Sequence, residues 1–269
     1  MKADVRGLLG KGRFVGRTAA FVGVTFGMYG MLEVDTALSA SGEREEVLHK
    51  WIRRYGQALL RLYGVQGIAR GAHVERGEMY PGRDERGRGR IFVMNHRSGL
   101  DIPISLAYVE ATIVSRADLA RWPVIGMAAR RVGTVFVDRQ SRQSGAAAIS
   151  TMVQAIERGR GVMVYPEGTT FEGDEVRPFR AGAFLTAQRT GAEIVPIGLA
   201  YEGEAASYGE ETFAEHMVRV SSAPTTRAAI VVGDPIPSGG EEIDALRERA
   251  RSEVQALVHK ARRALLGNP

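Results

Sequence analysis

Residues 91–101, Ile91-Phe92-Val93-Met94-Asn95-His96-Arg97-Ser98-Gly99-Leu100-Asp101, join a short apolar run to a polar turn. The apolar run predicts a buried strand that ends just before the histidine. An imidazole titrates near neutral pH, at about 6.5 when unperturbed, so His96 can take a proton from an alcohol and return it. A carboxylate at Asp101 would fix the tautomer of the ring and stabilise its protonated form. The stretch therefore predicts a proton-transferring pair at the end of a strand.

A second interpretation of the same residues is purely structural. Ser98 and Asp101 have the spacing of a helix capping box, with Ser98 as the N-cap and Asp101 at the third helical position. The two interpretations are compatible, because a capped helix start also holds the carboxylate rigid. The spacing alone leaves both open.

The chain around this stretch alternates β-type and helical patterns. Besides the strand at 90–94, we expect strands near residues 111–115, 134–137, 161–165, 193–201 and 227–232. Helices are expected from residue 98 and over residues 123–132, 141–158, 181–190 and 241–266. This alternation predicts an α/β fold with a mixed, mostly parallel sheet flanked by helices, preceded by an N-terminal helical hairpin.

The hairpin is expected over residues 1–63, ahead of an α/β domain over residues 64–269. No residue from Thr18 to Leu32 is charged, and the cations that precede this run are Lys2, Arg6, Lys11, Arg13 and Arg17. The run is shorter than the roughly 20 apolar residues of a spanning helix. It favours a packed helix or a segment that dips into one leaflet, with the cations on anionic head groups, and a spanning helix or a signal peptide are the alternatives. Residues 43–63 predict a basic amphipathic helix, which either lies on a membrane or packs on the protein.

The amino-acid composition excludes several classes of functional site. The 269 residues include no cysteine, which excludes disulfides, cysteine-based metal sites and a cysteine acyl-enzyme. No His, Asp or Glu cluster has ligand spacing, so no metal is implied. The net charge of +5 and the pI of about 9.7 favour anionic partners such as phosphates or an acidic membrane face. We expect no nucleic-acid partner, because no nucleic-acid module is recognisable.

Two more polar groups directly follow predicted strands. Arg139 follows one and Glu167 follows the next, as His96 follows the first. Ligands of open α/β sheets bind beyond the carboxyl ends of the strands, so we expect these side chains to meet there. Arg139 suits phosphate recognition, and Glu167 could either accept a hydrogen bond from a substrate hydroxyl or orient a loop. The alternatives are a surface pair of Arg139 with Asp138 and a plain turn at Pro-Glu-Gly.

Four sequence blocks, in order, resemble the glycerolipid acyltransferase family, which includes the bacterial 1-acyl-glycerol-3-phosphate acyltransferases. The family's Asn-His-x4-Asp block matches Asn95, His96 and Asp101, and its Gly-x-x-Phe-x-x-Arg block matches Gly133, Phe136 and Arg139. Its Pro-Glu-Gly-Thr block matches residues 166–169, and its Val-Pro block matches Val195-Pro196. Residues 115–119 and 123–126 are similar to the connecting segment. The resemblance covers roughly residues 90–200.

The resemblance implies a membrane-associated O-acyltransferase on the cytoplasmic face of the inner membrane. It would move a fatty acyl group from acyl-CoA or acyl carrier protein to the free hydroxyl of lysophosphatidic acid, giving phosphatidic acid, with no bound cofactor. His96 would be the general base, and Asp101 would orient it. The residues implied in substrate binding are Asn95, Arg116, Arg139, Glu167, Gly168, Thr169 and Arg180. Ser98 is not expected to be a nucleophile, because the chain has no Gly-x-Ser-x-Gly elbow.

One position departs from the family pattern. The third block commonly continues with an arginine that helps to hold the acceptor phosphate, and this chain has Thr170 there. Either Arg116, Arg177 or Arg180 supplies the cation, or the acceptor has another head group. The Pro-Glu-Gly-Thr-Thr sequence also resembles the enzymes that acylate lyso-ornithine lipid, which has no phosphate. The alternative from another class is a catalytically silent lysolipid-binding protein, which the intact motif residues disfavour.

Overall fold

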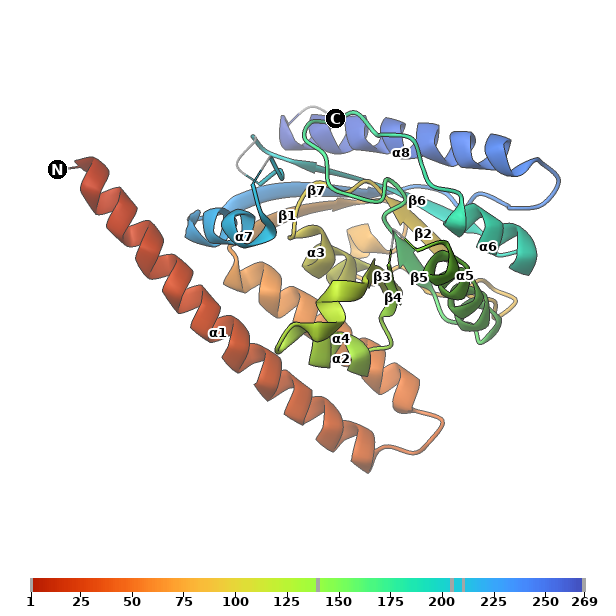
Figure 1. The fold of residues 1–269 in the computed structure, drawn as a ribbon, viewed down its shortest axis with the longest axis horizontal. Coiled ribbons are helices and arrows are strands. Elements are labelled where there is room, and N and C mark those ends of the chain that lie inside the picture. Colours follow the sequence, from red (N-terminus) through yellow and green to blue (C-terminus); the bar gives the residue numbers. More distant parts are fainter. Residues whose placement is uncertain (1, 139–140, 204–205, 210, 268–269) are drawn as a thin grey trace.

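A central sheet with helices on both faces forms the body of the protein (Figure 1), seen in a computed structural model that describes residues 2–138, 141–203, 206–209 and 211–267. The strands are β1 (Val65–Arg70), β2 (Ile91–Met94), β3 (Thr112–Arg116), β4 (Val135–Val137), β5 (Val162–Val164), β6 (Ile194–Tyr201) and β7 (Thr226–Val232). The α-helices are α1 (Lys2–Leu38), α2 (Arg44–Leu62), α3 (Asp101–Tyr108), α4 (Ile125–Arg131), α5 (Arg142–Glu157), α6 (Gly182–Thr190), α7 (Phe213–Ser222) and α8 (Ile243–Leu265). Beyond residue 40, every element predicted from the sequence is present, while β1 and α7 are additions.

The described strands form one seven-stranded sheet in the order β1-β7-β6-β2-β5-β3-β4. Neighbouring strands are parallel except for β6 and β7, which are antiparallel. The predicted mixed, mostly parallel sheet is therefore confirmed. Strand β2 lies between β6 and β5, so the residues that follow β2 and β5 emerge side by side at one edge.

Strand β2 is buried on both faces. Its four residues are fully inaccessible to solvent, and their side chains alternate between two cores. Phe92 and Met94 join a core shared with α2 and α3, whereas Ile91 and Val93 join a core beneath α5, α6 and α8. This double burial explains why all four residues are apolar.

Helix α8 covers the opposite face of the sheet from α2 and α3 (Figure 1). Its buried residues recur at helical spacing: Leu246, Ala250, Val254, Leu257, Val258, Ala261 and Leu265. The helix lies so close to β6 that a Cβ atom at Gly198 would overlap the backbone of Leu257 and Val258. Glycine is required there by close approach of the two backbones.

The predicted N-terminal helical pair is present, and its second helix is part of the body of the protein. Helix α1 is longer than the apolar run predicts, with 37 residues, and extends along the outside of the molecule (Figure 1). Leu59 and Tyr63 of α2 belong to the same core as Phe92 of β2. Leu32 packs with Trp51 in a small core between α1 and α2. Among the described helices, none is both long and apolar enough to cross a bilayer.

Two of the N-terminal cations bond to the protein itself. Arg13 donates to the Ser222 carbonyl at 2.8 Å, and Arg17 donates to the Ser221 and Ala223 carbonyls at 3.0 and 2.5 Å. These carbonyls lie at the C-terminal end of α7, where the helix dipole favours positive charge. Arg13 and Arg17 therefore hold α1 against the C-terminal end of α7.

Candidate active site

The turn after β2 brings the two predicted reactive side chains together. The imidazole Nδ1 of His96 lies 2.6 Å from Oδ2 of Asp101. The Asp101 side chain is fully buried, and the His96 side chain is 15% exposed. A carboxylate can only accept in this bond, so Nδ1 carries the proton and Nε2 is left free of it. An imidazole held in this way can accept a proton from a hydroxyl group at Nε2.

The Asp101 carboxylate is held by several other donors. Its Oδ2 accepts from the backbone N–H groups of Arg97 and Ser98 at 2.6 and 3.0 Å, and its Oδ1 accepts from the Tyr201 hydroxyl at 2.6 Å. The bond from Ser98 is one half of the expected capping box. The other half is not formed, and the predicted helical positions of Ser98 and Asp101 are wrong: Ser98 Oγ accepts from the Leu100 N–H at 3.2 Å, and α3 begins at Asp101 itself. One carboxylate thus closes the turn and orients the imidazole.

A tyrosine ring supports the His96 ring. Tyr165 stacks on it with ring centroids 4.3 Å apart and an interplanar angle of 27°. The Tyr165 hydroxyl shares a 2.8 Å hydrogen bond with Ser105 and donates to the Asp101 carbonyl at 3.1 Å. Burial, with the nearby charge of Asp101, raises the pKa of the Tyr165 and Tyr201 hydroxyls well above 10.0. Both hydroxyls therefore stay protonated at neutral pH.

The Glu167 side chain is paired within the protein and does not line the apolar cavity. Its two carboxylate oxygens accept from Nη1 of Arg97 at 3.0 and 2.9 Å, and both side chains are buried. Burial raises the pKa of the Glu167 carboxyl above 4.5, against the lowering effect of the Arg97 charge. Arg97 also donates to the Gly173 and Glu175 carbonyls at 2.7 and 2.8 Å. The pair fastens the loop after β5 to the loop after β2, and Arg97 had no role in the sequence interpretation.

Three other predicted site residues also make contacts within the protein. The Asn95 amide pairs with the backbone of Leu199, donating to its carbonyl at 2.9 Å and accepting from its N–H at 2.8 Å. Gly168 has a φ of +82°, and a Cβ atom there would overlap the Arg180 guanidinium, so glycine is required. Arg180 covers Gly168, and its N–H donates to the Pro166 carbonyl at 2.8 Å. These contacts set the course of the loops beside His96.

His96 lines a mainly apolar cavity of about 650 Å³ between the N-terminal helices and the α/β body. Apolar side chains from α1, α2, α3, α4 and α7 form most of its wall, among them Phe21, Met28, Trp51, Tyr55, Leu106, Ile125, Phe213 and Met217. A long apolar chain would be removed from water along such a wall. The cavity therefore places a reactive imidazole beside an environment suited to an acyl chain.

Several predicted polar residues also line this cavity. Thr169 and Thr170 line it together with His96. Arg116 also lines it, and its guanidinium makes two hydrogen bonds to Asp118 at 2.9 and 2.8 Å. Arg139 lies outside the described residues.

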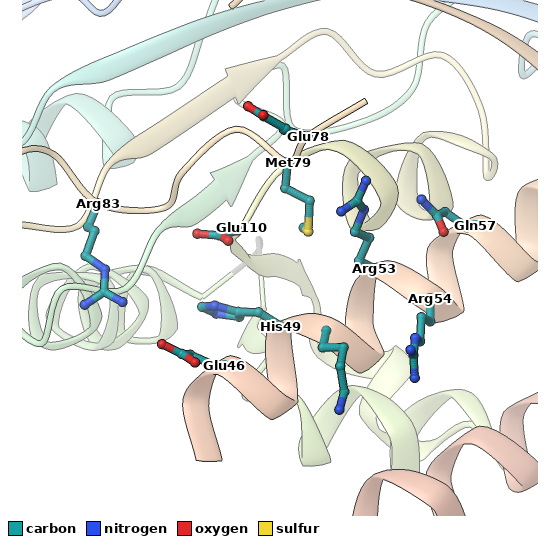
Figure 2. Close-up of a pocket in the computed structure, with 10 residues that line it drawn as sticks. Glu46, His49, Arg53, Arg54, Gln57, Glu78, Met79, Arg83 and Glu110 are labelled. Atoms are coloured by element: carbon teal, nitrogen blue, oxygen red, sulfur yellow. The ribbon is translucent and has the colours of Figure 1, made fainter. Parts of the chain in front are cut away.

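A second cavity, of about 680 Å³, is polar and lies elsewhere (Figure 2). Glu46, His49 and Arg53 reach it from α2, facing Arg83 and Glu110. Arg83 and Glu110 precede β2 and β3, so this cavity lies at the amino edge of the parallel strands. His96 lies at the carboxyl edge, where ligands of such sheets bind. We therefore assign the candidate active site to the apolar cavity.

Comparison with known proteins gives concordant matches. Residues 73–200 match the Acyltransferase family. A lyso-ornithine lipid O-acyltransferase of Pseudomonas aeruginosa is 29% identical over 174 residues, which are 62% of this chain and 67% of that protein. A 1-acyl-sn-glycerol-3-phosphate acyltransferase of Neisseria gonorrhoeae is 27% identical over 183 residues, 65% of this chain and 71% of that protein.

A solved structure has the same fold. The crystal structure of the 1-acyl-sn-glycerophosphate acyltransferase PlsC from Thermotoga maritima superposes with a TM-score of 0.73, covering 96% of each chain at 19% identity. The motif blocks, the family match and the similar curated proteins agree with one another. The predicted resemblance to the acyltransferase family is confirmed over residues 73–200, and the similar curated proteins support an O-acyltransferase.

Proposed function

We propose that this enzyme moves a fatty acyl group from an acyl thioester to the free hydroxyl of lysophosphatidic acid, with His96 as the general base. The observation that carries the proposal is the 2.6 Å pairing of His96 with Asp101 at the wall of the apolar cavity. The acyl chain would lie along the apolar wall, and the reacting hydroxyl would face Nε2 of His96. Phosphatidic acid and a free thiol would be the products.

The reaction needs one proton to move twice. His96 Nε2 takes the proton of the lysolipid hydroxyl while the oxygen attacks the thioester carbonyl carbon. The buried Asp101 carboxylate stabilises the imidazolium that forms. When the tetrahedral intermediate collapses, the carbon–sulfur bond breaks, and the imidazolium returns the proton to the departing thiolate. General base catalysis of this kind contributes on the order of 100- to 10,000-fold.

The second candidate acceptor is lyso-ornithine lipid. Thr170 lines the cavity at the position where the family commonly has arginine, and the cavity-lining Arg116 is already paired with Asp118. The Arg131 guanidinium, also in the cavity wall, is paired with Glu33. A neutralised wall favours an acceptor without a phosphate. The similar Pseudomonas aeruginosa protein is a lyso-ornithine lipid O-acyltransferase.

We further propose that residues 1–63 bring the enzyme to an anionic membrane surface, on the cytoplasmic face of the inner membrane, ahead of a catalytic domain over residues 64–269. Large apolar side chains on α1 are exposed to solvent, with Leu8 72% and Val15 64% accessible. An exposed apolar helix face is stabilised when it enters the boundary between head groups and acyl chains. The donor would be acyl-CoA or acyl carrier protein.

Release of free thiol from one acyl-CoA, measured with lysophosphatidic acid and with lyso-ornithine lipid in parallel, tests the proposal. Wild-type enzyme should release thiol with lysophosphatidic acid, and His96→Ala should lower turnover about 100- to 10,000-fold without unfolding the protein. His259→Ala, which removes an exposed imidazole on α8, is the matched control. Near-normal turnover in His96→Ala would contradict the role of His96. Turnover with lyso-ornithine lipid alone would select the second acceptor.

A further inference from the structure

A second histidine–carboxylate pair lies behind the turn that carries His96. His216 of α7 is completely buried, and its Nδ1 lies 2.9 Å from Oε1 of Glu211. Its Nε2 accepts from the Gly99 N–H at 3.1 Å and lies 3.1 Å from Ser98 Oγ. Arg219 pairs with Glu211. Ser98, His216 and Glu211 thus have the contact order of a nucleophile, a base and an orienting acid.

Ser98 is nevertheless not placed to attack a substrate. Its side chain is fully buried, and its Oγ accepts a hydrogen bond from the Leu100 N–H. The lone pair of His216 Nε2, which would have to take the serine proton, already accepts from Gly99. This arrangement holds backbone rather than performing chemistry on a substrate.

The Gly99 bond fixes the protonation of His216. A backbone N–H can only donate, so Nε2 is unprotonated and Nδ1 carries the proton toward Glu211. The Arg219 Nη2, 3.2 Å from Nδ1, also directs an N–H to Glu211. Burial lowers the pKa of His216 below 6.5, although Glu211 and Asp101 oppose this effect. The ring is therefore neutral at pH 7.

Ser98 connects the two histidines. Its backbone N–H donates to Asp101 Oδ2 on one side, while its hydroxyl and the next N–H, that of Gly99, face His216 on the other. The preceding carbonyl, of Arg97, accepts from the Tyr208 N–H at 2.7 Å, and the Tyr208 ring packs 4.6 Å from the His216 ring. The turn is therefore held between Asp101 and the segment that leads into α7.

We propose that His216 is a positioning residue for the reaction: it holds the backbone of Ser98 and Gly99 so that the Ser98 N–H stays on Asp101, which in turn orients His96. The inference rests on the proposed roles of His96 and Asp101. Without His216, the Gly99 N–H has no acceptor and the turn relaxes away from Asp101. The Asp101 carboxylate then accepts one hydrogen bond fewer, so its negative charge stabilises the protonated form of His96 more strongly.

Two matched variants separate this role from simple packing. In His216→Gln the side-chain oxygen can reach the position of Nε2 and accept from Gly99, whereas in His216→Asn, shorter by one methylene, it cannot. We expect His216→Asn to lower kcat about tenfold, with the KM of each substrate changed less than about twofold, the order of one lost hydrogen bond. Its pH profile of kcat/KM should show the acid limb moved to higher pH. His216→Gln should recover kcat to within about threefold of wild type.

The opposite outcomes are equally clear. An unchanged kcat and pH profile in His216→Asn, or equal losses in both variants, would overturn the positioning role. Covalent labelling of Ser98 in the wild-type enzyme by a lipid-like fluorophosphonate would overturn it as well, because Ser98 would then be an accessible nucleophile. If His216→Asn does not fold, nitrogen-15 NMR of histidine-labelled wild-type enzyme decides. The Nδ1-protonated tautomer of His216 is expected, and the Nε2-protonated tautomer would refute the proposal.

The His96→Ala variant distinguishes a failure of the proposed function from a failure of the proposed role of His216. If it keeps wild-type turnover, the proposed function fails first. If it is inactive while His216→Asn behaves as wild type, only the role of His216 fails.

Discussion

At the scale of single residues, the site is organised around one buried carboxylate. Asp101 accepts hydrogen bonds from the His96 ring, from two backbone N–H groups and from the Tyr201 hydroxyl. A fully buried charge is stable only when its lone pairs are used in this way. The same bonds fix the direction of the imidazole, so the structural and the chemical interpretations of the turn cannot be separated by geometry alone.

Kinetics can separate them. Replacing the carboxylate by an amide in Asp101→Asn removes the charge that stabilises the imidazolium, so we expect kcat to fall at least 100-fold with little change in KM for the lysolipid. Asp244→Asn, at a carboxylate side chain that is 82% exposed on α8, is the control. A rise in KM with normal kcat would instead assign Asp101 to the capping of α3 alone.

At the scale of elements, predictability follows burial. Strand β2 and helix α8 were predicted because their apolar residues follow the period of a buried strand and of a half-buried helix. Strand β1 was missed because it lies at the sheet edge, is only partly buried and contains Gly67. Helix α7 was also missed, although Thr212 and Glu215 form a complete capping box, a signal visible in the sequence.

The packing of α8 on β6 gives a test of element placement. Gly198→Ala would force the two backbones apart, because the added Cβ atom meets the backbone of Leu257. We expect a loss of about 1–3 kcal/mol in the free energy of unfolding, measured by urea denaturation. Gly239→Ala, where nothing lies within 4 Å of the added atom, is the control and should change stability little. Equal stability of the two variants would contradict the close approach.

The exposed face of α1 gives a second test. Leu8, Val15 and Phe26 are spaced by seven and eleven residues, so they share one face, and each is more than half exposed. Changing all three to Gln should weaken co-sedimentation with anionic vesicles at least tenfold, because the apolar area that enters the membrane is lost. Leu266→Gln, at an exposed apolar side chain directly after α8, is the control. Unchanged co-sedimentation would mean that this face has only a structural role.

At the scale of the whole molecule, the reactive pair was predictable and its support was not. His96 and Asp101 are five residues apart in the chain, so they lie close together whatever the rest of the fold is. Tyr201 and His216 join them from about a hundred residues downstream, and only the folded sheet and α7 create those contacts. Glu167 illustrates the same limit, because its position was predictable but its partner, Arg97, was not.

The buried groups also set how stability depends on pH. Burial lowers the pKa of His216 in the folded state, so its contribution to stability is complete above pH 6.5 and is lost as pH falls. Hydrogen bonds from Arg219 lower the pKa of Glu211 from 4.5 to about 2, so a further loss follows below pH 4.5. Burial raises the pKa of Glu167, which has the opposite effect at acid pH.

Melting temperatures measured from pH 8 to pH 4 should therefore fall as the solution becomes more acidic than about pH 6.5. His216→Gln should flatten the upper part of this decline, and Glu211→Gln the lower part. A melting temperature that stays constant down to pH 5 in the wild type would contradict the burial of a neutral imidazole at His216.

The apolar cavity has walls from segments far apart in the chain, since Phe21 and Met28 of α1 and Phe213 and Met217 of α7 all line it. A shortened enzyme that lacks α1 but keeps α2 would retain the core beneath the His96–Asp101 turn, yet the cavity beside that turn would be open to water. Such a truncation would expose the bound acyl chain to water and would also remove the apolar face proposed to bind the membrane. Its inactivity would therefore report two separate defects as one.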